Sequence, residues 1–274
     1  MVAPHGFGYL GQALSAAEQY AAVYGAALRP GIDRVICSPA HYVIAAYAAA
    51  AQTGLLDTAT LTTYGQDGSA LEAIGTERSP VPDYTCGSLG QGLSAAAGFA
   101  LADRLLGRPE VRTFAFLSDG EMQEGQVWEA AMFAAHYRLD RLTVLLDANN
   151  SQVDGPVDTI TTIEPVAAKW RAFGWDAVEL DGHDVGSVAA ALADGADAEV
   201  GGAEPEAGGA RPGIRGADAE AAPARPRILV CRTSTRHGLP CLPPDADGHF
   251  VKLPADLAAA ADAELSAELD RHDR

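Results

Sequence analysis

The sequence predicts a doubly wound α/β domain: a mainly parallel sheet with helices on both faces. Three observations point to it. Short apolar runs alternate with helical patterns, the runs 113–117 and 142–146 are continuously apolar, and 48% of the 274 residues are hydrophobic against 20% charged. Continuous apolar runs are typical of strands covered on both faces of a parallel sheet, and strands alternating with helices imply crossover connections. One domain over residues 1–274 is therefore expected.

The expected elements follow in order along the chain. Helices are predicted over 14–28, 41–53, 93–106, 126–137, 165–173, 184–193 and 254–269, and strands over 34–37, 113–117, 142–146, 175–180 and 227–232. The first helix has apolar residues at helical spacing and stops before Pro30, where a helix must end. The second closes at Gly54. The segment 62–84, rich in Gly, Pro and Ser, is expected to be loop.

Residues 194–226 interrupt this alternation. They contain almost no large apolar side chain and consist mainly of Gly, Ala, Pro and acidic residues. Because such a stretch cannot offset its ordering entropy by burial, a flexible surface insertion is expected. The flanking helix and strand can still pack, since the entropic cost of closing a loop grows slowly with its length.

Charge and cysteine content exclude several classes of function. The formal net charge is −18, from 37 acidic and 19 basic residues, which disfavours binding to nucleic acid or to anionic membranes. No apolar run approaches the roughly 20 residues needed to span a bilayer, and the first residues lack the pattern of a signal peptide. The four cysteines form no CxxC pair. A reduced cytoplasmic protein is expected.

Two polar clusters follow two neighbouring predicted strands. Ser118-Asp119-Gly120 ends the strand 113–117, and the run 147–151 (DANNS) ends the strand 142–146. Taken alone, Asp-Gly is usually a turn and Asn-Asn a cap. Together they lie at the edge where open parallel sheets bind ligands. Carboxylate, amide and carbonyl oxygens suit Mg²⁺ or Ca²⁺, with water and ligand phosphates completing the shell. Gly120 would let a diphosphate approach the backbone.

These clusters resemble the thiamine diphosphate motif, a GDG followed further along by Asn, and the surrounding SDGEMQEGQVWEAAMFAAHY resembles the N-terminal subunit of split transketolases. The resemblance covers nearly the whole chain outside 194–226. It implies the diphosphate-binding (PP) version of the thiamine diphosphate fold. It also implies that Asp119, Asn149 and the backbone carbonyl of Ser151 ligate the metal. Ser118 replaces the first glycine of GDG.

A second block, TCGSLGQGLS at residues 85–94, is similar to the family's TGSLGQGLS signature. Its glycines, Gly87, Gly90 and Gly92, would allow the backbone to turn against a flat ligand before a helix starts. A glycine-rich helix entry for close packing is the alternative interpretation. The resemblance implies cofactor contacts at Gly87, at the backbone of Leu89 and at Val153.

Three further residues are implied to be catalytic. His41 falls on the histidine of the family's SKGH motif, which touches the cofactor diphosphate and can shuttle protons. His249 falls on the histidine of its WHG motif, which contacts the cofactor and faces the reacting carbonyl; Phe250 replaces the glycine. Glu124 matches a glutamate that connects two cofactor sites across a subunit interface. The alternatives are a helix-start histidine, a loop histidine and a helix-start acid favoured by the helix dipole.

Two departures from the family concern the substrate. Tyr9 and Ile74 stand where two family histidines bind sugar hydroxyls. The tyrosine hydroxyl could still donate a hydrogen bond. An unchanged cofactor with an altered donor or acceptor is expected.

The resemblance implies a transketolase-like transferase that uses thiamine diphosphate and Mg²⁺ (or Ca²⁺) to move a two-carbon ketol unit from a ketose or ketose phosphate to an aldehyde. The cofactor would be the electron sink. In the family, the activating glutamate belongs to a separate pyrimidine-binding domain, so a partner subunit carrying that domain is expected, in an α₂β₂ heterotetramer. The alternatives are an E1α-like component that decarboxylates a 2-oxo acid and a non-catalytic thiamine diphosphate-binding scaffold.

Overall fold

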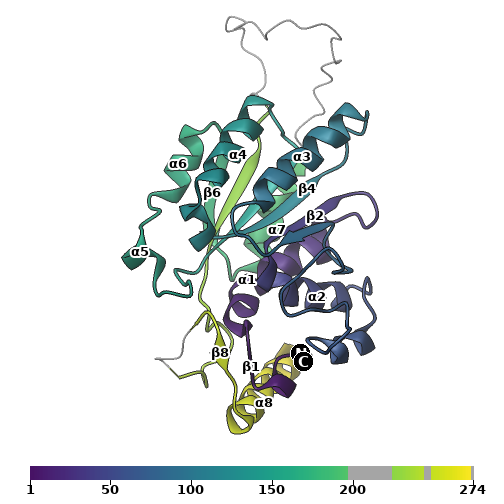
Figure 1. The fold of residues 1–274 in the computed structure, drawn as a ribbon, viewed down its shortest axis with the longest axis vertical. Helices are drawn as coiled ribbons and strands as arrows, with labels where there is room; N and C mark the ends of the chain where they lie inside the picture. Colours follow the sequence, from purple (N-terminus) through teal and green to yellow (C-terminus); the bar gives the residue numbers. More distant parts are fainter. Residues whose placement is uncertain (197–223, 244–247, 273–274) are drawn as a thin grey trace, which may run out of the picture.

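Six parallel strands build the central sheet, in the order β3-β2-β4-β5-β7-β6. The computed structural model describes residues 1–196, 224–243 and 248–272 (Figure 1). The strands are β2 (Arg34–Pro39), β3 (Tyr84–Cys86), β4 (Thr113–Ser118), β5 (Leu142–Ala148), β6 (Asp176–Asp181) and β7 (Arg227–Arg232). The chain adds β3 on one side of β2 and β4 on the other, so the order reverses at β2. The predicted doubly wound parallel sheet is confirmed.

Helices cover both faces of this sheet. One face carries α1 (Leu10–Ala22), α2 (Val43–Gln52) and α7 (Val185–Ala196), and the other carries α3 (Gly92–Leu105), α4 (Gly125–His136) and α6 (Val166–Ala172). The packing of β4 on both faces explains why the interior of this strand is apolar. Phe114 and Phe116 pack into the first core, whereas Ala115 and Leu117 pack into the second. Alternate side chains of one strand point to opposite faces, so a strand covered twice needs both sets apolar.

The first helix begins earlier than its apolar pattern predicted. Helix α1 starts at Leu10 and continues into a π-helical turn, Val23–Ala27, before Pro30. Its first turns bury Gly11, Gln12 and Ser15. Because these buried positions are small or polar, hydrophobic periodicity does not mark them.

Several short elements were not predicted. A small antiparallel sheet pairs β1 (Phe7–Gly8) with β8 (Val251–Lys252), and two-residue strands are too short to show periodicity. The helical turns are η1 (Ala3–His5), η3 (Ala40–Tyr42), η4 (Thr58–Thr63), η5 (Gly120–Gln123) and α5 (Val157–Ile160). Turn η4 overlaps the start of the segment predicted as loop, 62–84, and the unpredicted strand β3 begins at its last residue, Tyr84.

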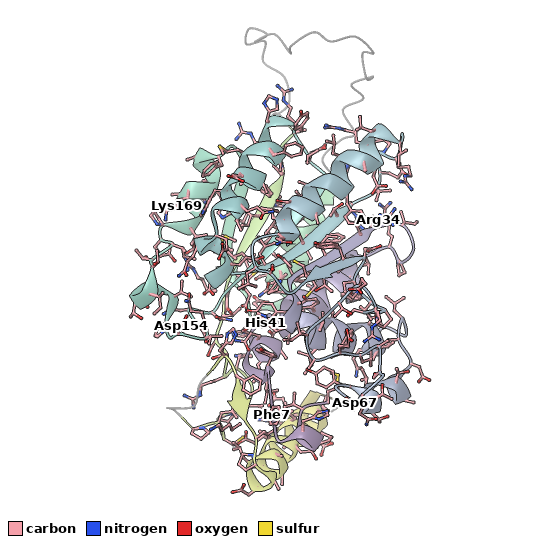
Figure 2. All side chains as sticks on the ribbon, in the orientation of Figure 1. Phe7, Arg34, His41, Asp67, Asp154 and Lys169 are labelled. Atoms are coloured by element: carbon pink, nitrogen blue, oxygen red, sulfur yellow. The ribbon has the colours of Figure 1, made fainter. Side chains whose placement is uncertain are left out.

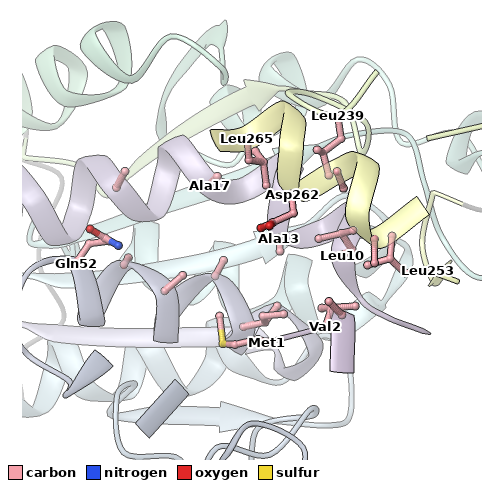
Figure 3. Close-up of a pocket in the computed structure, with 18 of the residues that line it drawn as sticks. Met1, Val2, Leu10, Ala13, Ala17, Gln52, Leu239, Leu253, Asp262 and Leu265 are labelled. Carbon is pink, nitrogen blue, oxygen red and sulfur yellow. The ribbon is translucent and has the colours of Figure 1, made fainter. Parts of the chain in front are cut away.

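The last helix, α8 (Ala255–His272), lies beside β1 and β8, below the central sheet in Figure 1. Between α8, α1 and α2 is an apolar cavity of about 880 Å³ (Figure 3). Leu10, Ala13 and Leu265 are among its lining residues. None of the helices in the described ranges has the length and hydropathy of a membrane span. All four cysteines are free thiols.

The predicted insertion, 194–226, falls mostly outside the described residues. Its first three residues, 194–196, belong to α7, which is a correction to the prediction. Helix α7 ends near the amino ends of the strands, where Arg227 begins β7 and its guanidinium donates to the carbonyl of Ala191. Both ends of the segment 197–223 therefore join the fold at the sheet edge opposite the carboxyl ends of β4 and β5.

A buried carboxylate holds the amino ends of β2 and β4 together. Asp33, only 4% exposed, accepts hydrogen bonds from the backbone amides of Arg29 and Arg112 at 2.9 and 3.0 Å and pairs with both guanidinium groups. Burial alone would raise the pKa of Asp33, but these donors outweigh it and hold the pKa below its usual value.

We expect Asp33→Asn to lower the free energy of unfolding by about 3 kcal/mol at pH 7, because it leaves two guanidinium groups without their carboxylate. Since the folded-state pKa is depressed, this contribution is present above about pH 4 and is lost as the pH falls through the folded value. Urea unfolding of both proteins at pH 7 and in acid checks it. The exposed Asp67→Asn serves as control, and an equal loss in both variants would contradict the assignment.

Candidate functional site

The two predicted polar clusters meet at the carboxyl edge of the sheet. Strands β4 and β5 are in register, with Ser118 opposite Asp147. Asp119 donates its backbone amide to the carbonyl of Asp147 at 3.1 Å, and its carboxylate accepts from the amide of Asn150 at 2.5 Å. The predicted ligand residues therefore lie on neighbouring strand tips, with the turn after Asn149 directly against the Asp119 carboxylate.

Asp147, which the sequence did not single out, is the acceptor that joins the elements of the site. It is 1% exposed. Its carboxylate accepts from Ser15 Oγ at 2.5 Å, Tyr42 Oη at 2.7 Å, Asn149 Nδ2 at 2.8 Å, Gln19 Nε2 at 3.3 Å and the hydroxyl of Thr233. A buried carboxylate is tolerated when its oxygens are satisfied in this way. Helix α1, turn η3, strand β5 and the segment after β7 converge on it.

These bonds also orient Asn149. Its amide nitrogen points inward, to Asp147 and to the hydroxyls of Ser15 and Tyr42, each at 3.1 Å. Its Oδ1 faces the turn, where it accepts from the Ser151 amide at 2.8 Å. The backbone at Asn150 is left-handed, with φ of 56°. The amide oxygen of Asn149 therefore faces the turn whose Asn150 amide contacts the Asp119 carboxylate.

The electrostatics of this edge favour a cation. Burial, together with the nearby Asp147 carboxylate, raises the pKa of Asp119 to about 7. Within the described part of the chain, no Lys, Arg or His forms an ion pair with Asp119 or Asp147. The Asp119 carboxylate, buried without a protein cation near the Asn149 amide oxygen, has the ligand chemistry that a hard divalent ion prefers.

The two predicted catalytic histidines face each other beside this edge. The ring centroids of His41 and His249 are 5.0 Å apart, and Tyr9 lies against both, at 4.9 and 5.7 Å. Burial and the neighbouring His249 lower the pKa of His41 to about 3, so its ring is neutral at pH 7. Its buried Nε2 has no hydrogen-bond partner among the described residues. Such an atom is suited to a ligand.

Contact between two glycines places His249. A Cβ added to Gly11 of α1 would lie 1.8 Å from the carbonyl oxygen of Gly248. The two backbones can therefore touch only because Gly11 has no side chain. A side chain on Gly248 would in turn lie 3.5 Å from Ser151 Oγ. Gln12, the next residue of α1, has its Nε2 2.7 Å from His249 Nδ1. Helix α1 thus holds His249 next to the turn that carries Ser151.

Glu121 is a second buried acid that the sequence did not identify. It is fully buried and accepts from the Ser38 hydroxyl, from the Gly90 amide at 2.7 Å and from the Ser118 amide at 3.3 Å. Burial raises its pKa to about 7. The bonds tie the glycine-rich loop before α3 to the turn that carries Asp119. The only sequence signal was its place in SDGEMQEG, where nothing distinguished it from Glu124.

Glu124 is exposed at the start of α4. It packs against the glycine-rich loop: Gly90 has a φ of 85°, and a side chain there would lie 2.8 Å from Glu124 Cβ. Gly92 likewise leaves room for Ser38 at 2.3 Å. Gly87 shows neither a left-handed backbone nor a close neighbour. Close packing against the protein therefore accounts for Gly90 and Gly92, and the predicted room for a flat ligand stays a prediction at all three glycines.

The remaining predicted contact residues lie around the edge of the site. Leu89 is 40% and Val153 72% exposed. Gly120 faces Gln152, whose Cβ would be 3.3 Å from an added side chain. Ile74 is 45% exposed, and the next residue, Gly75, donates its amide to Ala40 at 2.9 Å, directly before His41. The roles predicted for these residues toward a cofactor stay predictions.

A cluster of Glu18, His183 and His237 lies behind this site and has the composition of a metal centre. Its geometry favours hydrogen bonding instead. The two rings stack at 3.6 Å and 12°, so one ion could not lie in both ring planes. His183 Nε2 accepts from the Ser234 amide at 2.8 Å, which leaves the proton on Nδ1, 3.1 Å from Glu18. The cluster anchors the segment that contains Thr233.

Comparisons with known proteins give a consistent result. The family "Transketolase, thiamine diphosphate binding domain" matches residues 6–201. An uncharacterised transketolase family protein of Sinorhizobium fredii is 36% identical over 267 residues, 93% of this chain and 86% of that protein. The 6-deoxy-6-sulfo-D-fructose transketolase subunit of a Clostridium species is 34% identical over 272 residues, 96% of this chain and 90% of that protein.

A solved structure shares the fold. The transketolase of Campylobacter jejuni superimposes with a TM-score of 0.71 at 20% identity, over 93% of this chain. The present chain spans only 41% of that protein.

We expect Gly11→Ala to destabilise the protein by about 1–3 kcal/mol, because the added methyl overlaps the Gly248 carbonyl and must displace the segment that carries His249. Gly98→Ala in α3 is the matched control, since nothing lies within 4 Å of the added carbon. The control should gain about 0.5–1 kcal/mol from helix propensity. Urea unfolding measures both. A Gly11 variant as stable as the wild type would mean that the two backbones do not touch.

Proposed function

Because the chain belongs to the transketolase family through its thiamine diphosphate-binding domain, we propose that it is the N-terminal subunit of a transketolase-like enzyme. The assembled enzyme transfers a two-carbon ketol unit from a ketose to an aldehyde. The observation that carries the proposal is the buried oxygen cluster on the tips of β4 and β5, beside two facing histidines.

The residues present fit a diphosphate held through a divalent ion. Asp119, Asn149 Oδ1 and the Ser151 carbonyl would hold Mg²⁺, and His41 would meet the phosphate oxygens through its unpartnered Nε2. When bound, thiamine diphosphate supplies the electron sink that lets a carbon–carbon bond next to a carbonyl break. The glycine-rich loop containing Leu89, fixed by Glu121, is proposed to meet the flat part of the cofactor.

The proposed step conserves electrons overall. The donor ketose loses the bond between its second and third carbons, and its third carbon leaves as an aldehyde. The two-carbon unit then forms a bond to the carbonyl carbon of the acceptor, whose oxygen takes up a proton. His249, oriented by Gln12, is proposed to donate to the oxygen that gains charge. The His41 ring is kept neutral by burial, so it has one ring N–H to donate.

A partner subunit is proposed to complete the site. Large apolar side chains around the edge, Ile74, Leu89 and Val153, are exposed, as expected of a surface that another protein covers. One relative is named as a transketolase subunit, and this chain spans 41% of a solved transketolase. We infer a pyrimidine-domain subunit that supplies the activating glutamate, in an α₂β₂ assembly whose interface includes Glu124.

Removal of the metal or of its main ligand should abolish cofactor binding by the complex. Calorimetry with thiamine diphosphate and Mg²⁺ is expected to show binding that EDTA eliminates and that Mg²⁺ or Ca²⁺ restores. Asp119→Ala should weaken the affinity by at least about 100-fold, since loss of a supporting residue alone typically costs 10–100-fold. The exposed Asp158→Ala should bind like the wild type. Equal binding by wild type and Asp119→Ala would defeat the proposal.

The reaction class is tested with two donors. The complex should release CO₂ from hydroxypyruvate and pass the two-carbon unit to an aldehyde, giving a ketol that is detected by mass spectrometry. With pyruvate it should release little CO₂. Preferential use of pyruvate would instead identify an E1α-like component, and no turnover of either donor by a cofactor-loaded complex would indicate a binding scaffold.

A further inference from the structure

Three aromatic side chains form a continuous surface that leads away from the two histidines. We name Phe7, Tyr9 and Phe250 the aromatic wall. The Tyr9 and Phe250 rings meet edge to face with centroids 5.1 Å apart, and Phe250 lies 5.5 Å from Phe7. The pairing of β1 with β8, which sets Gly8 opposite Val251, holds the three residues together.

The inner end of the wall belongs to the candidate site. Tyr9 contacts His41 and His249 with ring centroids 4.9 and 5.7 Å away. The outer end is open, because Phe250 is 36% and Phe7 54% exposed. Figure 2 shows His41 at the edge of the central sheet and Phe7 in the lower part of the molecule. The three rings therefore form an exposed apolar surface that begins beside the two histidines.

The wall carries no charge of its own. Its polar group is the Tyr9 hydroxyl, and the nearest cation by strand register is Lys252, opposite Phe7 at the outer end. Among the described residues, no Lys or Arg forms a ring contact with Tyr9, Phe250 or Phe7. A phosphate placed over Tyr9 or Phe250 would lose hydration, and the cation that this chain offers on the same face is Lys252, at the outer end beside Phe7. An apolar group placed there would gain burial.

We propose that the aromatic wall determines acceptor specificity, and that the enzyme prefers aldehydes with an uncharged aryl or branched alkyl body over sugar phosphates. The inference rests on the proposed function and adds the class of acceptor. In the transfer step the two-carbon unit bonds to the carbonyl carbon of the acceptor, and the carbonyl oxygen takes a proton. The aryl or alkyl body lies on Phe250 while the carbonyl faces the histidines.

The test uses the reconstituted complex with hydroxypyruvate as donor and either benzaldehyde or D-glyceraldehyde 3-phosphate as acceptor. We expect kcat/KM to be at least about tenfold higher for benzaldehyde, since small changes in apolar contact already give factors of 10–200. Phe250→Ala should lower the ratio of the two values by about tenfold. Phe133→Ala on α4, where the ring is 38% exposed, is the matched control and should leave the ratio unchanged.

Each other outcome has a distinct meaning. A ratio that favours the sugar phosphate, or that Phe250→Ala does not change, overturns the inference while CO₂ release still supports the proposed function. Loss of the complex on gel filtration in Phe250→Ala alone would identify the wall as a partner contact, which also overturns the inference. If hydroxypyruvate is not consumed with either acceptor, the proposed function itself fails and the inference falls with it.

Discussion

The Asp147 carboxylate is the constraint on which the rest of the site depends. Leaving it unsatisfied in the core would cost several kcal/mol, so the fold must bring donors to it from helix α1, turn η3 and the segment after β7. Each of these segments also carries or leads into a residue of the site. Satisfying one buried acid therefore aligns Asn149, His41 and the approach to His249 at the same time.

Much of the fold could be read from the sequence because the sheet is covered on both faces. TFAFL and LTVLL are apolar apart from one threonine near each amino end, as a doubly covered strand requires. Parallel topology then brings the polar clusters that follow them to the same edge. The start of α1 was missed because its buried face there is Gly11, Gln12 and Ser15. Strands β1 and β8 have two residues each, which is too short to show an alternation of apolar and polar side chains.

The site was predictable only in part, for a related reason. Spacing brings Asp119 to Asn149, since both follow strands, but it does not show which acid after Asp119 turns inward. Glu121 is buried and Glu124 exposed because the loop amides of Gly90 and Ser118 lie on the inner side. The contact of Gly11 with Gly248 joins residues far apart in the chain, and neither glycine shows locally that the other is its neighbour.

The connection between α7 and β7 has a practical consequence. Its two attachment points, near Ala196 and Arg227, are on the amino edge of the sheet, a full strand length from Asp119 and His41. A fluorophore or surface linker attached at this edge of the sheet would be remote from the chemistry. Molecules immobilised through that edge would all present the same reactive side to the solution.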